Sequence, residues 1–226
     1  GAVSSSTILD PLKADDRKAD NPEKTPIALK LPGEDGKETY VGAHPMPGDG
    51  VLADKDVKGT AYHVDCKAKV TDSDGSVDKP YTSIEQINTH EAFKAGDAIL
   101  FKRGTVCEGL LHPHGSGEAG NPIVIDAYGT PSDALPIIHG HGIEEKADND
   151  IPTKLKTQTN KGIESAVVRF YNQHDWAVRH LELTNYTGDS GDYTMRRRGV
   201  VVAAEDAGRV SGFEITGLTI RDVLGA

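Results

Sequence analysis

The stretch Trp176-Ala-Val-Arg-His-Leu-Glu-Leu-Thr-Asn185 returns in its apolar pattern as Phe213-Glu-Ile-Thr-Gly-Leu-Thr-Ile-Arg-Asp222. Four positions recur 37 residues later (215 − 178 = 37), as the pairs Val178 and Ile215, Leu181 and Leu218, Leu183 and Ile220, and Asn185 and Asp222. Repeats of a few tens of residues are typical of stacked units that bury their apolar faces on one another. The pattern predicts a solenoid whose unit is strand, turn, strand, with Asn or Asp at the corner.

A shorter apolar segment precedes each of these stretches. Val167-Val-Arg-Phe170 precedes the first and Val200-Val-Val-Ala203 the second, 33 residues later (200 − 167 = 33). Further strand-like segments, each bounded by Gly or Pro, occupy residues 61–65, 98–101, 109–112, 122–128 and 136–139. Consecutive apolar positions indicate buried parallel strands, and the gaps between them are too short and too polar for helical crossovers. A parallel sheet without helices must coil on itself, so the sequence predicts an all-β, right-handed parallel β-helix.

The region before the solenoid divides into two parts. Residues 1–59 are rich in Pro and charge, which predicts an extended or docked N-terminal segment, with a flexible linker as the alternative. Residues 60–226 are expected to form the first rungs of the β-helix, with an excursion loop at about 143–162. Ser83 and Gln86 have capping-box spacing, which predicts a short helix over residues 82–90 that covers the first rung.

The last residue, Ala226, follows an apolar rung without a polar closing element. An uncapped stack exposes apolar surface and unpaired strand edges. We therefore expect the chain to end within the solenoid and the remaining rungs to come from a second polypeptide or a cleaved segment.

Composition narrows the classes of partner. The net charge is −10, which argues against binding to a nucleic-acid backbone and favours neutral or cationic ligands; an acidic surface that only maintains solubility is the alternative. The sequence contains no run of about twenty apolar residues, so no membrane span is predicted. Cys66 and Cys107 are consistent with one disulfide or with two free thiols.

Several segments together point to a known class of protein. They are Tyr62-His-Val-Asp65, Asp78-Lys-Pro-Tyr-Thr-Ser-Ile84, Ala95-Gly-Asp-Ala-Ile-Leu-Phe-Lys-Arg-Gly104, Gly115-Ser-Gly-Glu-Ala-Gly-Asn-Pro-Ile-Val-Ile125 and Pro136-Ile-Ile-His-Gly140. This succession resembles the opening of bacterial right-handed β-helix proteins of the pectate-lyase-like class. Arg197-Arg-Gly-Val-Val-Val-Ala-Ala-Glu-Asp-Ala-Gly208, leading into Leu218-Thr-Ile-Arg-Asp222, resembles β-helical glycoside hydrolases, among them the bacterial lacto-N-biosidases.

The resemblance implies a secreted or cell-surface enzyme that cleaves an oligosaccharide lying in a groove along the helix. Lacto-N-biosidases release a disaccharide from oligosaccharides such as those in milk. Their catalytic carboxylates lie in middle rungs, so no catalytic residue is assigned here. A polysaccharide lyase and a non-catalytic subunit that binds sugar or assists folding of a partner are the alternatives.

Residues near the last two rungs are the candidates for contact with a sugar. Tyr193 could stack on a sugar ring, Arg197 and Arg198 could donate to hydroxyls or a carboxylate, and Asp206 lies beside a turn. A solvated basic turn paired with nearby acids is the alternative for the arginines. Trp176 is interpreted as an anchor at a rung corner, with a sugar platform as the alternative.

Other motifs give weaker signals. Asp72-Ser-Asp-Gly75 lacks the spacing of an EF-hand, and His139-Gly-His141 lacks an evident third metal ligand. We expect no cofactor, with Ca²⁺ left open as a structural ion. Asn185-Tyr-Thr187 fits a glycosylation sequon, although a corner Asn explains it as well.

Overall fold

The computed structural model describes residues 28–30, 39–41, 54–143, 164–188, 196–204 and 206–224, and the regular secondary structure of this part of the chain is almost entirely β. The helical elements are the 3₁₀ turn η2 (Asp54–Asp56) and the helix α1 (Ile84–Asn88). The strands are β1 (Ala28–Lys30), β2 (Thr39–Val41), β3 (Ala61–Val64), β4 (Ala98–Lys102), β5 (Val106–Glu108), β6 (Ile123–Tyr128), β7 (Ile137–His139), β8 (Glu164–Tyr171), β9 (Trp176–Arg179), β10 (Glu182–Thr184), β11 (Arg196–Ala203), β12 (Phe213–Thr216) and β13 (Thr219–Arg221).

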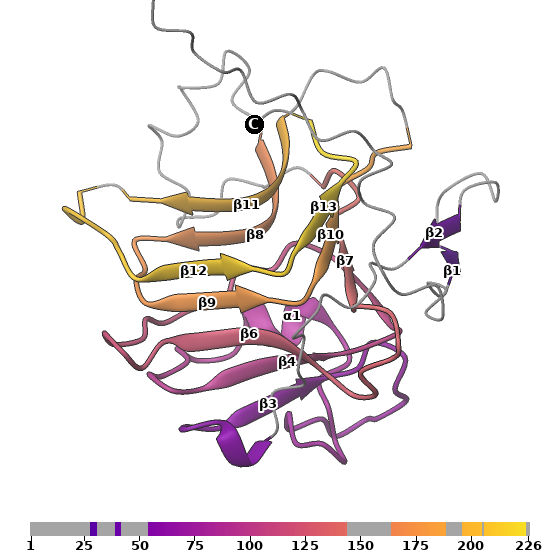
Figure 1. Ribbon diagram of the computed structural model, residues 1–226, viewed down its shortest axis with the longest axis horizontal. Coiled ribbons are helices and arrows are strands. Elements are labelled where there is room, and N and C mark those ends of the chain that lie inside the picture. Colours follow the sequence, from indigo (N-terminus) through magenta and orange to yellow (C-terminus); the bar gives the residue numbers. More distant parts are fainter. Residues whose placement is uncertain are drawn as a thin grey trace, which may run out of the picture.

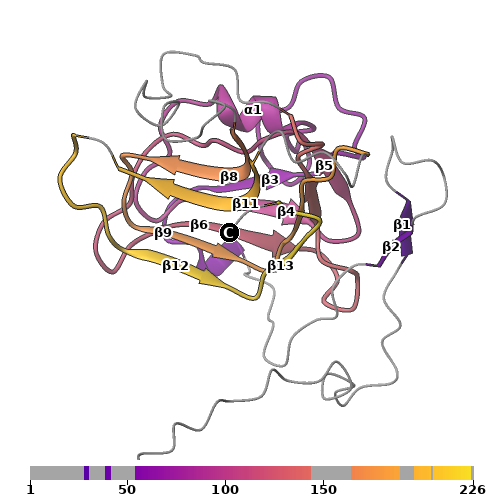
Figure 2. The ribbon, with the colours of Figure 1, turned by 90° about the horizontal axis from the view of Figure 1, so that it is seen from above.

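Three parallel sheets are built from strands that the chain visits in a fixed rotation (Figure 1). One sheet has the order β12-β9-β6-β4-β3, the second β13-β10-β7-β5, and the third pairs β11 with β8. From β6 onward the chain passes through the first, second and third sheet and then returns to the first. Figure 2, seen from above, shows the strands of the three sheets arranged around one interior. The prediction of an all-β chain with parallel strands is confirmed.

The 37-residue repeat is reproduced in the strand register. Val178 of β9 lies opposite Ile215 of β12, and Leu183 of β10 lies opposite Ile220 of β13. These repeated apolar positions stack on earlier strands as two columns, which are Ile99, Ile125, Val178 and Ile215 in one sheet, and Cys107, Ile138, Leu183 and Ile220 in the next. Each fully buried Ile or Leu contributes roughly 1.5–3 kcal/mol to stability.

The 33-residue spacing of the shorter segments is wrong by one position. Val200 of β11 pairs with Val168 of β8, a spacing of 32 (200 − 168 = 32). Both Val167 and Val168 are fully buried, so the strand has no alternation of apolar and polar residues that could define its register. An uninterrupted apolar run therefore predicts a buried strand without specifying its partner.

The strand expected at residues 109–112 also differs from the structure. The chain forms β5 three residues earlier, and Gly109 then adopts a φ of 124°, which ends the strand. Leu111 makes a single parallel bridge to Val168 of β8 and is fully buried. Leu111 is buried and Leu110 is half-buried, so the apolar pair indicated burial at one of its two positions but not regular strand structure.

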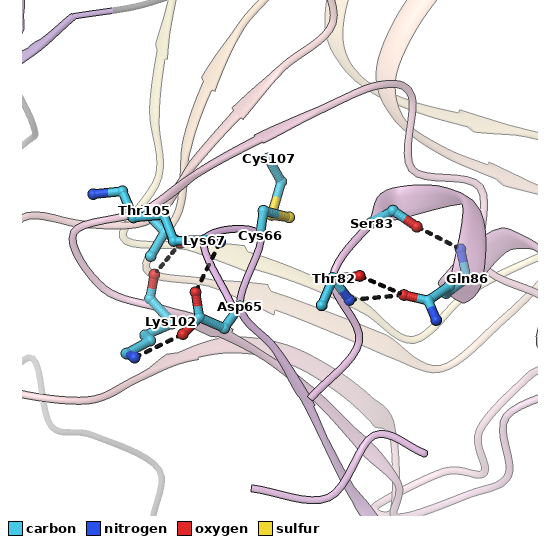
Figure 3. The surroundings of a disulfide bond; sticks show 9 residues. All are labelled: Asp65, Cys66, Lys67, Thr82, Ser83, Gln86, Lys102, Thr105 and Cys107. Carbon is cyan, nitrogen blue, oxygen red and sulfur yellow. Dashed lines mark hydrogen bonds and ion pairs between the residues drawn. A yellow bond between two sulfur atoms is a disulfide. The ribbon is translucent and has the colours of Figure 1, made fainter. Parts of the chain in front are cut away.

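The expected helix is present as α1, and its N-terminus is capped. The Ser83 hydroxyl accepts a hydrogen bond from the Gln86 backbone N–H at 3.3 Å. The Gln86 side chain in turn accepts from the backbone N–H of Thr82 at 2.7 Å, one residue before the position of a standard capping box (Figure 3). Ile84 and Ile87 are buried in the apolar interior. The helix thereby covers part of this interior, and its Ile84 lies beside Gly109, which follows β5.

A disulfide joins Cys66, just after β3, to Cys107 in β5 (Figure 3). The two residues are 41 positions apart, so the bond closes a loop that contains α1 and β4. Beside it, the Lys102 ammonium donates to the Asp65 carboxylate at 2.7 Å. The disulfide fixes the first sheet to the second at this end of the stack.

Parts of the chain that the sequence singled out lie outside the described residues. These are most of the N-terminal segment and residues 144–163 of the predicted excursion loop. Within the N-terminal segment, β1 and β2 pair antiparallel. Among the described residues, no helix is long and apolar enough to cross a membrane.

Replacing both Cys66 and Cys107 by Ser is expected to lower the free energy of unfolding by about 4 kcal/mol. The disulfide closes a loop of this length and thereby lowers the conformational entropy of the unfolded chain, and the variant lacks this effect. Urea unfolding with and without reductant measures the change. The double variant serves as the control, since reductant should leave its midpoint unchanged. Equal midpoints for the wild type in both conditions would show that the bond does not form.

Candidate functional site

A polar hollow opens beside α1 and the third sheet, with a volume of about 580 Å³. This volume lies in the range of small-molecule sites in proteins. It is formed where the end of α1, the segment after β5 and the turn after β8 meet. Its lining consists of Asn88, Thr89, His112, Pro113, His114, Gly115, Ser116, Arg169, Tyr171, Asn172 and Gln173.

Side-chain amides on opposite sides of the hollow fix the backbone between them. The Asn88 amide donates to the Leu110 carbonyl at 2.7 Å and accepts from the His112 N–H at 2.7 Å. Gln173 donates to the carbonyls of Pro113 at 2.8 Å and Gly115 at 2.7 Å. The segment 110–115 is therefore held between α1 and the turn after β8, and the shape of the hollow is set before any ligand arrives.

Gly115 occupies a position that excludes a side chain. Its φ is 109°, and a Cβ there would overlap the backbone oxygen of Phe93. The Gly115 carbonyl also accepts from the Trp176 indole N–H at 3.1 Å. Trp176 is fully buried against Phe170, so the interpretation of this residue as a corner anchor agrees with the structure.

Arg169 is the buried cation of the hollow. It lies on β8 between the core residues Val168 and Phe170, and it is 9% exposed. Its Nη2 lies 3.4 Å from Nδ1 of His112. A guanidinium can only donate, so His112 accepts through Nδ1 and carries its own proton on Nε2.

A second group of polar residues follows the second sheet from strand to strand. Glu108, His139, Thr184 and Arg221 occupy the same register position on β5, β7, β10 and β13. Arg221 donates through Nε to the buried Glu182 at 2.5 Å and through Nη1 to Asp222 at 2.9 Å. Paired charges on adjacent strands of a parallel sheet can be satisfied only when the register is correct, so these groups help to specify the stacking.

Burial lowers the pKa of His139 from 6.5 to about 4, and the adjacent His141 ring, whose centroid lies 3.7 Å away, adds to the effect. The folded protein therefore takes up a proton at His139 only in strong acid. The unfolded chain takes it up near its ordinary pKa. Stability from this group is fully present above pH 6.5 and is lost as the pH falls towards 4.

Removing this titration should flatten the acid dependence of stability. The difference in unfolding free energy between the wild type and His139→Gln should shrink by about 3 kcal/mol between pH 7 and pH 4, because Gln cannot take up a proton. Urea unfolding at several pH values measures it. His114→Gln, at an exposed position, is the control. A difference that stays constant with pH would contradict the buried neutral state of His139.

Burial also raises the pKa of Asp126, while the His180 ring at 2.7 Å opposes the shift by hydrogen bonding to the carboxylate. Asp126 lies on β6 directly after three apolar residues, and His180 lies in the turn after β9 with a φ of 53°. The contact ties two successive turns of the chain together at this corner.

Asn185 is a fully buried corner residue that joins three segments. Its Oδ1 accepts from the Gly142 N–H at 2.8 Å, and its Nδ2 donates to the carbonyls of Ser165 and Arg198, both at 3.2 Å. Since both amide hydrogens are engaged, the folded protein cannot carry a glycan at this sequon. The alternative of a corner Asn is therefore the one that the structure supports.

Replacing Asn185 by Ala should lower the free energy of unfolding by about 3–5 kcal/mol, because it leaves buried backbone groups on three segments without partners. Chemical unfolding measures the loss. The intact mass of wild-type protein secreted from a glycosylating host should show no glycan at Asn185. A loss below 1 kcal/mol would contradict the bridging role.

The predicted sugar-contacting residues are not brought together in one site by the described structure. Tyr193 lies outside the described residues. Arg197 is 5% exposed and donates to the Asn185 carbonyl at 3.0 Å. Arg198 is half-buried, and Asp206 is an exposed turn residue with a φ of 54°. Contact of these four residues with a sugar stays a prediction.

The hollow was not predicted, although one of its residues carried a signal. An arginine in the middle of Val167-Val-Arg-Phe170 interrupts an apolar strand, and a strand buried on one face presents such a residue on the other. Its partner His112 lies 57 residues earlier (169 − 112 = 57), and no local pattern connects the two residues.

Among the described residues, no group of three or more His, Cys, Asp or Glu side chains is placed to hold a metal ion. His139 and His141 lie together, and Glu108 approaches His141 at 3.4 Å. A structural Ca²⁺ stays a prediction.

The fold and the hollow define the class of molecule as an all-β protein of parallel sheets with a polar concavity on its surface. Comparison with known proteins narrows this class. The chain is 26% identical over 195 residues to a lacto-N-biosidase from Bifidobacterium longum subsp. longum, covering 74% of this chain and 12% of that protein.

Two solved structures of a GH136 lacto-N-biosidase from Eubacterium ramulus are also similar. The native protein has a TM-score of 0.59 at 29% identity, and the selenomethionine derivative a TM-score of 0.57 at 28% identity. They cover 76% and 74% of this chain, and in both cases 28% of the solved chain. No protein-family profile matches. The chain thus resembles glycoside hydrolases of the lacto-N-biosidase kind and spans less than a third of their length.

Proposed function

We propose that this chain forms the first turns of a right-handed parallel β-helix in a secreted or cell-surface glycoside hydrolase that acts on oligosaccharides. The observation that carries the proposal is the similarity in both sequence and structure to GH136 lacto-N-biosidases over about three quarters of the chain. The strand order supports it, because a chain that visits three parallel sheets in rotation coils around one interior.

The upper edge of the stack is suited to receive further turns. Among the described residues, β12, β13 and β11 each have a strand neighbour on one side in their sheets, and β11 makes one further antiparallel bridge from Arg197 to Leu224. Apolar side chains are exposed there, with Val202 at 40%, Ile215 at 44% and Ile220 at 43%. Ile215 and Ile220 continue the two interior columns, so a following turn would bury them as β12 and β13 bury the residues beneath.

The occupant of this edge is proposed to be the next turns of the same fold. The solved relatives are more than three times as long as the part that this chain covers. Those turns are proposed to come from a second polypeptide or from a segment of the same precursor. Edge strands that present hydrogen-bonding groups and apolar side chains pair readily with further strands.

Catalysis is proposed to require the added turns. Glycoside hydrolysis needs two carboxyl groups, about 5 Å apart for retention or about 6.5–9.5 Å apart for inversion of the anomeric centre. The carboxylates of Glu182 and Asp222 are both bound to Arg221. These residues serve the register of the second sheet, and no catalytic pair is assigned to this chain.

Mixing this chain with a polypeptide that carries the following turns tests the proposal. The 226-residue chain alone should release no disaccharide from milk oligosaccharides, and addition of a polypeptide carrying the following turns should restore release, measured by chromatography of the products. Ile215→Asp at the edge should reduce the restored rate at least about tenfold, because a charge would be buried at the junction. Val77→Asp, at a position 57% exposed in a loop, is the matched control.

Two results would overturn this proposal. An ultraviolet-absorbing unsaturated product would establish a lyase. Formation of a complex without any hydrolysis would establish a non-catalytic subunit.

A further inference from the structure

The last described turn of the stack, formed by β11, β12 and β13, buries much less of its interior face than the turn beneath it. Ile215 and Ile220 are 44% and 43% exposed, whereas Val178 and Leu183, which lie opposite them in register, are fully buried. Every residue of β12 and β13 is at least partly exposed. Strands with so little burial are expected to open locally unless other contacts hold them.

An ion pair joins β12 to β9, the strand beside it in the first sheet (Figure 1). The Arg179 guanidinium donates through Nε to Oε1 of Glu214 at 2.9 Å and through Nη2 to Oε2 at 3.0 Å. Bidentate contacts of this kind are stronger and more directional than single hydrogen bonds. These hydrogen bonds lower the pKa of Glu214. The two side chains are 29% and 48% exposed, so dissolved salt can weaken the pair.

A second ion pair joins β13 to β10 in the second sheet. The Arg221 guanidinium donates through Nε to Oε1 of Glu182 at 2.5 Å, and through Nη1 to Asp222 at 2.9 Å. The Glu182 side chain is fully buried, so salt screens this pair less than the first. Removing one charge of a buried pair also costs more than removing one charge of an exposed pair. We call the pairs Arg179–Glu214 and Arg221–Glu182 the outer clamps.

The outer clamps do not obstruct the edge of the stack. Successive side chains of a strand point to opposite faces, so Glu214 and Arg221 point away from the interior that Ile215 and Ile220 face. A following turn can therefore bury both isoleucines while the clamps stay closed. Among the described residues, β12 and β13 are the last strands of their sheets, so their outer edges remain available for strand addition.

We propose that the outer clamps hold the last described turn in its folded form before any following turn is added, and that its edge is a preformed template for parallel strands. The partner that fits this edge is a turn whose strands carry apolar side chains in register with Ile215 and Ile220. The inference rests on the proposed function, because it takes the following turns as the occupant. A preformed edge associates faster than one that must first become ordered.

Hydrogen exchange of the isolated 226-residue chain, followed by mass spectrometry, tests whether the edge is preformed. After correction for intrinsic rates, β12 and β13 should exchange at least about tenfold more slowly than the exposed loop 206–209. Sodium chloride at about 1 M should speed exchange in β12 more than in β13, because the clamp of the first sheet is the more exposed. Exchange of both strands as fast as that of the loop would overturn the proposal.

Substitutions that break each clamp give a second test on the isolated chain. Glu214→Gln should raise exchange in β12 about threefold, as expected for an exposed pair. Arg221→Gln should raise exchange in β13 at least about tenfold, because the carboxylate that it contacts is buried. Glu118→Gln and Arg209→Gln remove the same charges at exposed positions and are the matched controls, which should exchange as the wild type does.

The exposed clamp provides a test that does not depend on the folding of Arg221→Gln. The double variant Arg179→Gln with Glu214→Gln should exchange in β12 as fast as Glu214→Gln alone, because both changes break the same pair. Additive effects of the two changes, or exchange in β12 that is unchanged by either, would overturn the clamping role.

The rate of complex formation with a polypeptide that carries the following turns tests the template role. Arg221→Gln should slow association at least about tenfold, and Arg209→Gln should leave it unchanged. Equal association rates for wild type and Arg221→Gln would overturn the template role. Protected strands without a complex would contradict the proposed function, whereas a complex formed from a chain with unprotected strands would contradict this inference.

Discussion

The structure depends on one constraint, which is that each strand from β5 onward finds its hydrogen-bonding partner one turn of the chain away rather than in its sequence neighbour. Val178 pairs in register with Ile215, and Leu183 pairs with Ile220, so these apolar side chains of the interior lie above one another. Unpaired backbone groups are costly when buried. A shift of the strand register by one residue would turn the interior columns outward. It would disrupt the burial of the apolar side chains and the backbone hydrogen bonding together.

Polar groups reinforce this register at the corners. Asn185 joins three segments through one amide, Arg221 joins Glu182 to the last described strand of its sheet, and His180 reaches back to Asp126. The contacts of Asn185 with Gly142, of Arg221 with Glu182 and of His180 with Asp126 join segments of successive turns and depend on the correct stacking. Because these side chains are satisfied within the stack, they are specificity elements of the fold, and a ligand must be recognised by other residues.

The sequence predicted those parts of the fold whose signal repeats. The 37-residue spacing identified β9, β10, β12 and β13 and their pairing, and the Gln86 spacing identified α1. The register of β8 and β11 could not be predicted, because Val167 and Val168 are both buried and no alternation distinguishes them. The hollow could not be predicted either, since it forms only when segments far apart in the chain are coiled into adjacent turns.

The division between repeated and unrepeated residues explains where function can arise in this fold. Residues at repeated positions form the interior and the corners. A substitution at such a position therefore alters the packing of the next turn. Arg169 stands on a strand whose interior side chains are repeated by Val200 and Val202 of β11, while its own register partner on β11 is Val201. Arg169 lies beside His112 and lines the hollow, outside the repeated interior columns.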